Sequence, residues 1–245
     1  CASPTRGIFN QGSVPTYKRT IEYITIATGG NTTNFGESSK AGAGGPAGAS
    51  SVTRGVFAGG QHDNPYPLSD IIDYITIATE GNAIDFGDLA AATVQASGLS
   101  NSIRGCFAGG SSPNKTNVIS FVTIASTGNA TDFGNLTVAR KGLMACSNST
   151  RALFGGGETP SNSNIIDFIT IATTGNAQDF GDLTAARNTT GATSSPTRGI
   201  FAGDGSTDTL DKVEILTTGN AVDFGNLGRG ASRTYGAFSN GHGGL

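Results

Sequence analysis

The octapeptide TRGVFAGG at residues 53–60 recurs along the chain, and this repetition decides the fold. Related octapeptides begin at residues 5, 103, 150 and 197 and read TRGIFNQG, IRGCFAGG, TRALFGGG and TRGIFAGD. The arginine that they share recurs every 47 to 50 residues, at Arg6, Arg54, Arg104, Arg151 and Arg198. Self-similarity at a fixed period of about 20 to 50 residues is typical of solenoids, propellers and other repeat architectures.

Each repeat contains further blocks that predict β-strands. Residues 71–79, IIDYITIAT, are rich in β-branched and aromatic side chains, which favour strands. The Gly81-Asn82 pair that follows tolerates a positive φ, so we interpret Asn82 and its counterparts as turn formers. A short block at residues 85–89, DFGDL, predicts the next strand, and a small polar stretch leads to the following octapeptide. Four strands in about 47 residues match the size of a propeller blade.

The composition excludes several other classes of protein. The 245 residues include 38 Gly, only 13% are charged, and the formal net charge is −3. A coiled coil needs many more charged residues and leucines, and collagen needs glycine at every third position. The mildly acidic balance argues against a nucleic-acid partner, and no apolar run approaches the length of a membrane span. We therefore expect neither nucleic-acid binding nor membrane insertion.

The cysteines give no sign of a disulfide framework. The chain has three, Cys1, Cys106 and Cys146, and none belongs to a Cys-x-x-Cys pair. We expect Cys106 and Cys146 to be buried as small apolar residues.

The order of the blocks resembles the kelch repeat. A strand ending in Gly-Gly is followed by a strand with an acid and an aromatic residue, and then by a short aromatic strand. Phenylalanines stand where kelch blades carry tryptophan, at Phe86, Phe133, Phe180 and Phe224. Arg140 and Arg187 match the kelch arginine that precedes the innermost strand. The resemblance implies an all-β, kelch-like propeller of four-stranded blades, in which a buried aromatic side chain packs as the tryptophan does.

The two ends of the sequence suggest how the ring closes. Residues 236–240 align with residues 191–195, which form the innermost strand before the last octapeptide. We therefore predict one domain over residues 1–245, a five-bladed propeller in which the strand at residues 236–245 completes the first blade. This closure leaves no free sheet edge. The alternative is a fragment of a longer ring or fibre.

The sequence predicts no catalytic residues, metal site or cofactor. A Ser-His-Asp site needs a histidine base, but the only histidines are His62 in a variable loop and His242 among glycines. One repeat position carries an acid in four copies, with Ser120 as the exception: Glu22, Asp73, Asp167 and Asp211. A residue that recurs in the blades does the same structural work in each, so we interpret these acids as turn or inter-blade hydrogen bonds, with a carboxylate-lined binding ring as the alternative. We interpret the repeated arginines as inter-blade contacts.

The segments that differ between repeats are the candidates for binding. They follow the Gly-Gly of each octapeptide, at residues 13–18, 61–69, 111–117, 158–164 and 205–209. Because strands alternate in direction within a blade, all five loops should emerge on one face, and recognition commonly uses variable loops on a rigid scaffold. We predict ligand contacts from seven residues of these loops: Tyr17, Lys18, His62, Asp63, Tyr66, Lys115 and Glu158.

A second resemblance carries the functional expectation. The Thr-Gly-Asn-Ala-x-Asp-Phe-Gly-Asp-Leu pattern, as in residues 174–183, is similar to repeats in virion structural proteins of marine bacteriophages. This resemblance implies a tail-fibre or decoration protein on the virion, possessing no enzymatic activity, that contacts a host surface glycan or other virion proteins, and that is oligomeric within a larger assembly. A secreted lectin or kelch scaffold is the first alternative, and a carbohydrate-active enzyme is the second.

Overall fold

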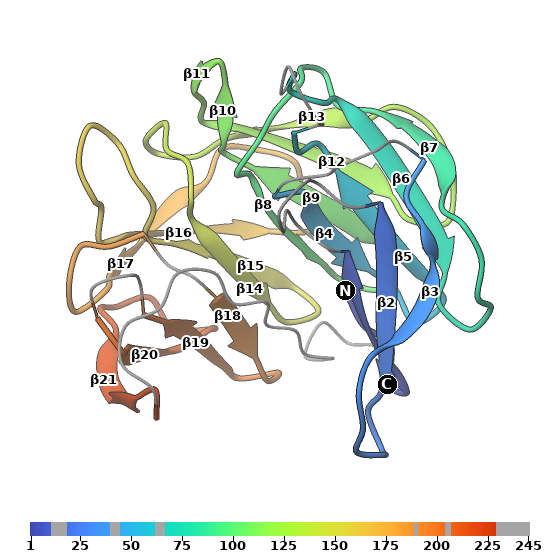
Figure 1. Ribbon diagram of the computed structural model, residues 1–245. Helices are drawn as coiled ribbons and strands as arrows, with labels where there is room; N and C mark the ends of the chain where they lie inside the picture. The colour runs from blue at the N-terminus through green and yellow to red at the C-terminus, as the bar shows by residue number, and fades with distance from the viewer. Residues whose placement is uncertain (11–18, 40–44, 62–66, 189–190, 204–206, 229–245) are drawn as a thin grey trace.

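The chain folds into a five-bladed β-propeller (Figure 1). The computed structural model describes residues 1–10, 19–39, 45–61, 67–188, 191–203 and 207–228. Within these ranges all regular structure is β, and no helix could span a membrane. The prediction of an all-β propeller with five blades is therefore confirmed.

Each blade is an antiparallel sheet whose strands follow the order of the chain. Blade 1 contains β1 (Arg6–Asn10), β2 (Thr20–Thr25) and β3 (Thr33–Glu37). Blade 2 contains β4 (Ala47–Ser50), β5 (Arg54–Ala58), β6 (Ile71–Thr76) and β7 (Ile84–Asp88). Blade 3 contains β8 (Ser97–Ser100), β9 (Arg104–Ala108), β12 (Val118–Thr123) and β13 (Thr131–Asn135), and its β9–β12 loop carries the hairpin β10 (Ser111–Ser112) and β11 (Asn114–Lys115).

Blades 4 and 5 repeat this order. Blade 4 contains β14 (Met144–Ser147), β15 (Arg151–Gly155), β16 (Ile165–Thr170) and β17 (Gln178–Asp182). Blade 5 contains β18 (Gly191–Ser194), β19 (Arg198–Ala202), β20 (Thr209–Glu214) and β21 (Val222–Asn226). The strand predicted at residues 236–245 to complete blade 1 lies outside the described residues.

The hydrophobic core lies between blades rather than within them. Each of four clusters of buried residues combines side chains from two consecutive blades. The cluster between blades 2 and 3, for example, joins Ile72 and Phe86 to Val122 and Ile124. Burying one such side chain contributes roughly 1.5 to 3 kcal/mol, so most of the apolar stabilisation depends on neighbouring blades being in contact.

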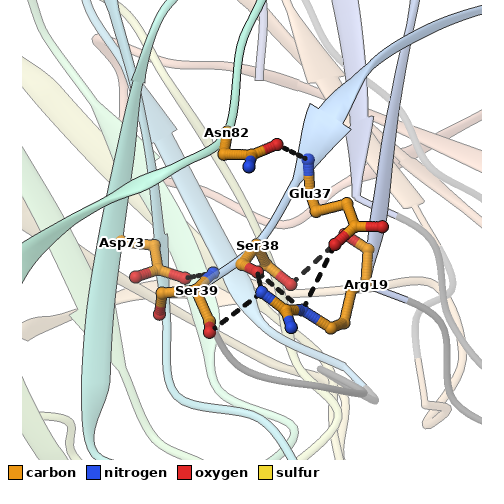
Figure 2. Close-up of polar contacts among 6 residues, drawn as sticks. All are labelled: Arg19, Glu37, Ser38, Ser39, Asp73 and Asn82. Atoms are coloured by element: carbon orange, nitrogen blue, oxygen red, sulfur yellow. Dashed lines mark hydrogen bonds and ion pairs between the residues drawn. The ribbon is translucent and has the colours of Figure 1, made fainter.

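The boundary between two consecutive blades, which we call a joint, also contains a repeated polar contact. In the joint between blades 1 and 2, the turn before β7 lies along the outer strand β3. The amide of Gly81 donates to the Phe35 carbonyl at 2.8 Å, and the amide of Glu37 donates to the side-chain oxygen of Asn82 at 3.1 Å. Figure 2 shows this second bond together with the bond from the Ser39 amide to the Asp73 carboxylate, 2.9 Å long.

Glycine is required where the strand meets the turn. A side chain on Gly36, whose φ is +154°, would collide with the carbonyl of Gly81. Gly87, Gly134 and Gly181 face the corresponding glycine of the next blade in the same way. The asparagines therefore do more than form the turns: Asn82, Asn129, Asn176 and Asn220 each accept a hydrogen bond from the preceding blade.

Four of the five repeated arginines form inter-blade contacts, as predicted. The Arg54 guanidinium lies 4.6 Å from the centre of the Tyr74 ring in its own blade and donates to the Ile124 carbonyl of the next blade at 3.0 Å. Arg6, Arg104 and Arg151 make the corresponding contacts. Arg198 differs, because its described partner is Glu214 of the same blade, at 3.1 Å.

The aromatic prediction is confirmed for Phe86, Phe133 and Phe180 and is wrong for Phe224. The first three rings are at most 3% exposed, whereas Phe224 is 56% exposed. The physical reason is the missing neighbour: no turn of another blade lies on β21 within the described residues, whereas such turns lie on β7, β13 and β17.

The two internal cysteines are buried, as predicted. Cys106 is 0% and Cys146 is 4% exposed, and burial raises the pKa of each thiol to about 12. Since the thiolate is the nucleophile, we expect iodoacetamide at pH 8 to leave both residues unmodified in the folded protein and to alkylate both in urea. Peptide mass spectrometry measures this directly. Rapid native labelling of either cysteine would contradict the burial described.

Candidate binding site

The described parts of the variable loops after β5, β9 and β15 lie on one face of the molecule, beside the segments that link the blades. The amides of Gly60, Gly110 and Gly157, each the second glycine of a Gly-Gly pair, donate to the Thr93, Arg140 and Arg187 carbonyls of the linkers. The loop after β9 also pairs with the linker between blades 2 and 3 through Ser111 and Val94. We call this side, which carries β10 and β11 in Figure 1, the loop face.

Two of the predicted site residues are brought together on the loop face. Lys115 on β11 places its Nζ 2.6 Å from Oε1 of Glu158, in the next blade's loop. The pKa of Glu158 is lowered, first by this hydrogen bond and then by the positive charges of Lys141 and Lys115. The backbone of Glu158 also pairs with Lys141 of the linker. Lys115 and Glu158 therefore connect neighbouring loops. The other predicted residues, Tyr17, Lys18, His62, Asp63 and Tyr66, lie outside the described residues.

Buried ion pairs lie beneath the loop face at two of the joints. Arg140 is 3.0 Å from Asp167 between blades 3 and 4, and Arg187 is 2.7 Å from Asp211 between blades 4 and 5. All four side chains are at most 1% exposed. Burial lowers the pKa of the Arg140 guanidinium, and the charge of Asp167 opposes this shift.

Hydroxyl and backbone groups complete these ion pairs. The Thr137 hydroxyl donates to Asp167 at 2.6 Å, and the Thr184 hydroxyl donates to Asp211 at 2.7 Å. Arg140 also donates to the Phe154 carbonyl at 3.0 Å. The repeated acids Asp73, Asp167 and Asp211 therefore form inter-blade contacts. Glu22 differs, because it accepts a hydrogen bond from the Thr32 hydroxyl in the β2–β3 turn of its own blade, at 2.8 Å.

The joint between blades 2 and 3 lacks both members of the pair. Thr93 occupies the position of Arg140 and Arg187, since all three carbonyls accept the same Gly-Gly amide bond, and Ser120 replaces the acid. A cavity of about 100 Å³ occurs here. Its lining includes Leu89, Thr93, Phe107, Ser112, Thr116 and Ser120. Two small residues thus leave a hollow where the joints between blades 3 and 4 and between blades 4 and 5 hold an arginine.

The lining of this hollow defines what it can accept. It contains apolar and hydroxyl side chains and no charged residue. An apolar cavity of about 150 Å³ accommodates benzene, so about 100 Å³ suits a group of roughly four non-hydrogen atoms. A neutral group with one apolar end and one polar end, such as a methyl, hydroxymethyl or acetyl substituent, fits this lining better than an ion.

The described part of the chain offers no comparable site for a metal. No group of three His, Cys, Asp or Glu side chains in these ranges is placed to hold one.

Sequence reasoning missed the hollow, although its signal was present. Ser120 stands out as the one copy without an acid, and its linker carries Thr93 where the next two linkers carry Arg140 and Arg187. That both exceptions fall on the two sides of one joint becomes apparent only when consecutive blades are placed side by side.

The fold and the loop face define the class of protein: a five-bladed β-propeller with a small neutral pocket between two blades. No model of a known protein family matches the chain, and no curated protein sequence matches it.

Proposed function

We propose that this propeller is a binding module without enzymatic activity whose loop face contacts a surface glycan. The hollow at the joint between blades 2 and 3 carries this proposal. It lies beside the variable loop at residues 111–117, which contributes Ser112 and Thr116 to its lining. A pocket formed by the loss of a structural ion pair, on the face where the repeats differ most, is what a ligand site grafted onto a repeat scaffold requires.

The chemistry of the pocket supports a neutral carbohydrate. Sugars present apolar C–H and methyl groups next to hydroxyl and amide groups, and the lining offers both kinds of contact. The pocket is small, so one site binds weakly, and several copies on one particle raise the avidity. Together with the similarity of the repeats to marine phage structural proteins, this supports a tail-fibre or decoration protein of a virion that contacts a host glycan or another virion protein.

Two other functions make different predictions. A secreted lectin or kelch scaffold would use the same loop face but would have no virion partner, so co-purification with phage particles separates it from the proposal. A carbohydrate-active enzyme would release product from the glycans that it binds, which thin-layer chromatography or mass spectrometry of the incubated glycan detects.

Filling the hollow should abolish binding without loss of folding. The double variant Thr93→Arg/Ser120→Asp restores the ion pair of the joints at Arg140 and Arg187, so the new side chains should occupy the cavity. We expect glycan-array binding to fall by about tenfold or more, equivalent to about 1.4 kcal/mol, and the thermal midpoint to stay within a few degrees. Ile103→Ser is the matched control, since Ile103 is 62% exposed in the β8–β9 turn on the opposite face.

The outcome separates the parts of the loop face. Equal binding by the filled variant and the wild type would remove the hollow from the site. If Tyr17→Ala/Tyr66→Ala then abolished binding, the outer loops would carry recognition instead. Absence of binding to any glycan, with retention on purified virion proteins, would favour the virion-protein partner.

A further inference from the structure

Blade 5 presents one half of a joint that has no partner within the described residues. The Phe224 ring is 56% exposed, whereas the equivalent Phe35, Phe86, Phe133 and Phe180 are at most 3% exposed. A side chain on Gly225 would meet no atom within 4 Å, although the equivalent Gly181 lies against the backbone of Gly219. The outer edge of β21 therefore has the composition of an inter-blade contact and the exposure of a free surface.

Blade 1 presents the other half. Its turn carries Gly30 and Asn31, which correspond to Gly81 and Asn82. Ile26 is 47% exposed, whereas its equivalents Ile77, Ile124, Ile171 and Ile215 are at most 1% exposed. This surface carries the same groups that contact the outer strand of the preceding blade in blades 2 to 5.

The four complete joints define how the two halves fit. In each joint a turn glycine donates to the carbonyl of the outer-strand phenylalanine, at 2.7 to 2.8 Å. In each, an asparagine side chain accepts an outer-strand amide, at 3.0 to 3.1 Å. Applied to the free halves, this pattern pairs Gly30 with the Phe224 carbonyl, and Asn31 with the amide of Asn226.

We propose that the outer strand of blade 5 binds the blade 1 turn of a second copy of this chain, head to tail. The described ends of one chain do not meet: β21 and β3 lie well apart in Figure 1, and both halves are exposed in the same structure. Each copy nevertheless carries both complementary halves, and the contact continues an interface that the chain already forms four times. Such a contact is heterologous, so it generates either a closed ring of subunits or an open filament. It is independent of the loop face.

The test is the molar mass as a function of concentration, measured by light scattering in the presence of a reducing agent. The wild type should rise above 24.6 kDa as its concentration increases. Phe224→Asp disables the strand half and Asn31→Leu disables the turn half, so each variant alone should stay monomeric. An equimolar mixture retains one usable interface and should stop at a dimer, about twice 24.6 kDa.

The controls keep the result interpretable. Ile84→Asp introduces the same charge at an apolar residue that is 58% exposed away from the free halves, and should associate like the wild type. Circular dichroism melts should show that the variants remain folded. A wild type that stays monomeric throughout overturns the proposal, as does a Phe224→Asp variant that associates normally. A disulfide between Asn31→Cys and Asn226→Cys that forms within one chain shows self-closure and also overturns it.

Discussion

Asp211→Ser is expected to lower the free energy of unfolding by about 3 to 5 kcal/mol, because it leaves a buried guanidinium without its carboxylate. Arg187 is 1% exposed and Asp211 is 0% exposed, and their atoms approach to 2.7 Å. Nε and Nη1 of Arg187 have no hydrogen-bond partner among the described residues, so removing Asp211 leaves the buried guanidinium still less satisfied. Urea-induced unfolding followed by circular dichroism measures the change.

Adding Arg187→Thr to the same chain should recover most of this loss. The double variant reproduces the Thr93 and Ser120 combination that the protein itself carries between blades 2 and 3. Removing both charges leaves only a cavity cost, so the double-mutant cycle should show a coupling of about 1 kcal/mol or more. Strictly additive losses would mean that the pair contributes through packing and not through charge compensation.

Phe180→Ala is expected to cost about 3 to 5 kcal/mol, because it removes a large side chain from the contact between blades 4 and 5. Phe180 is 2% exposed and packs edge-on against Phe168, with ring centres 6.1 Å apart. The repeat supplies its own control: Phe224→Ala at the equivalent position should cost less than about 0.5 kcal/mol, as is usual at exposed sites. Unfolding at low protein concentration keeps any association through Phe224 out of the measurement.

The comparison of these two variants tests the packing of the aromatic residue directly. A loss below about 1 kcal/mol for Phe180→Ala would contradict the view that phenylalanine replaces the kelch tryptophan. Equal losses for both variants would mean that Phe224 is covered in solution.

The architecture was predictable because five copies report the same local rules. Strand-forming residues at 71–76, a Gly-Asn turn and a following aromatic strand recur in order, and each copy alone would have been ambiguous. The role of the glycine in Asp-Phe-Gly was not predictable, because its requirement comes from the carbonyl of the next blade. The exposure of Phe224 depends equally on a neighbour that its own sequence cannot specify.

The candidate site was less accessible to sequence reasoning. Loop variation predicted that Lys115 and Glu158 lie on one face, but their 2.6 Å ion pair depends on how two loops from different blades meet. The hollow depends on the absence of two side chains, at Thr93 and Ser120, and small residues in a sequence rich in Thr and Ser attract no notice. A search for mismatched repeats across predicted neighbours, instead of for conspicuous residues, finds such sites.

The joint between blades has a consequence for how proteins of this kind change over evolutionary time. Its hydrogen bonds use backbone groups and one asparagine, and a pair of glycines allows the close approach. Each of the five repeats carries both the Gly-Asn turn and the outer-strand glycine. A duplicated or deleted gene segment of one repeat length therefore produces a new boundary that already fits. Recombination can add, remove or exchange whole blades with their loops while these hydrogen bonds are kept, and only the buried ion pairs, where present, must match across the new boundary.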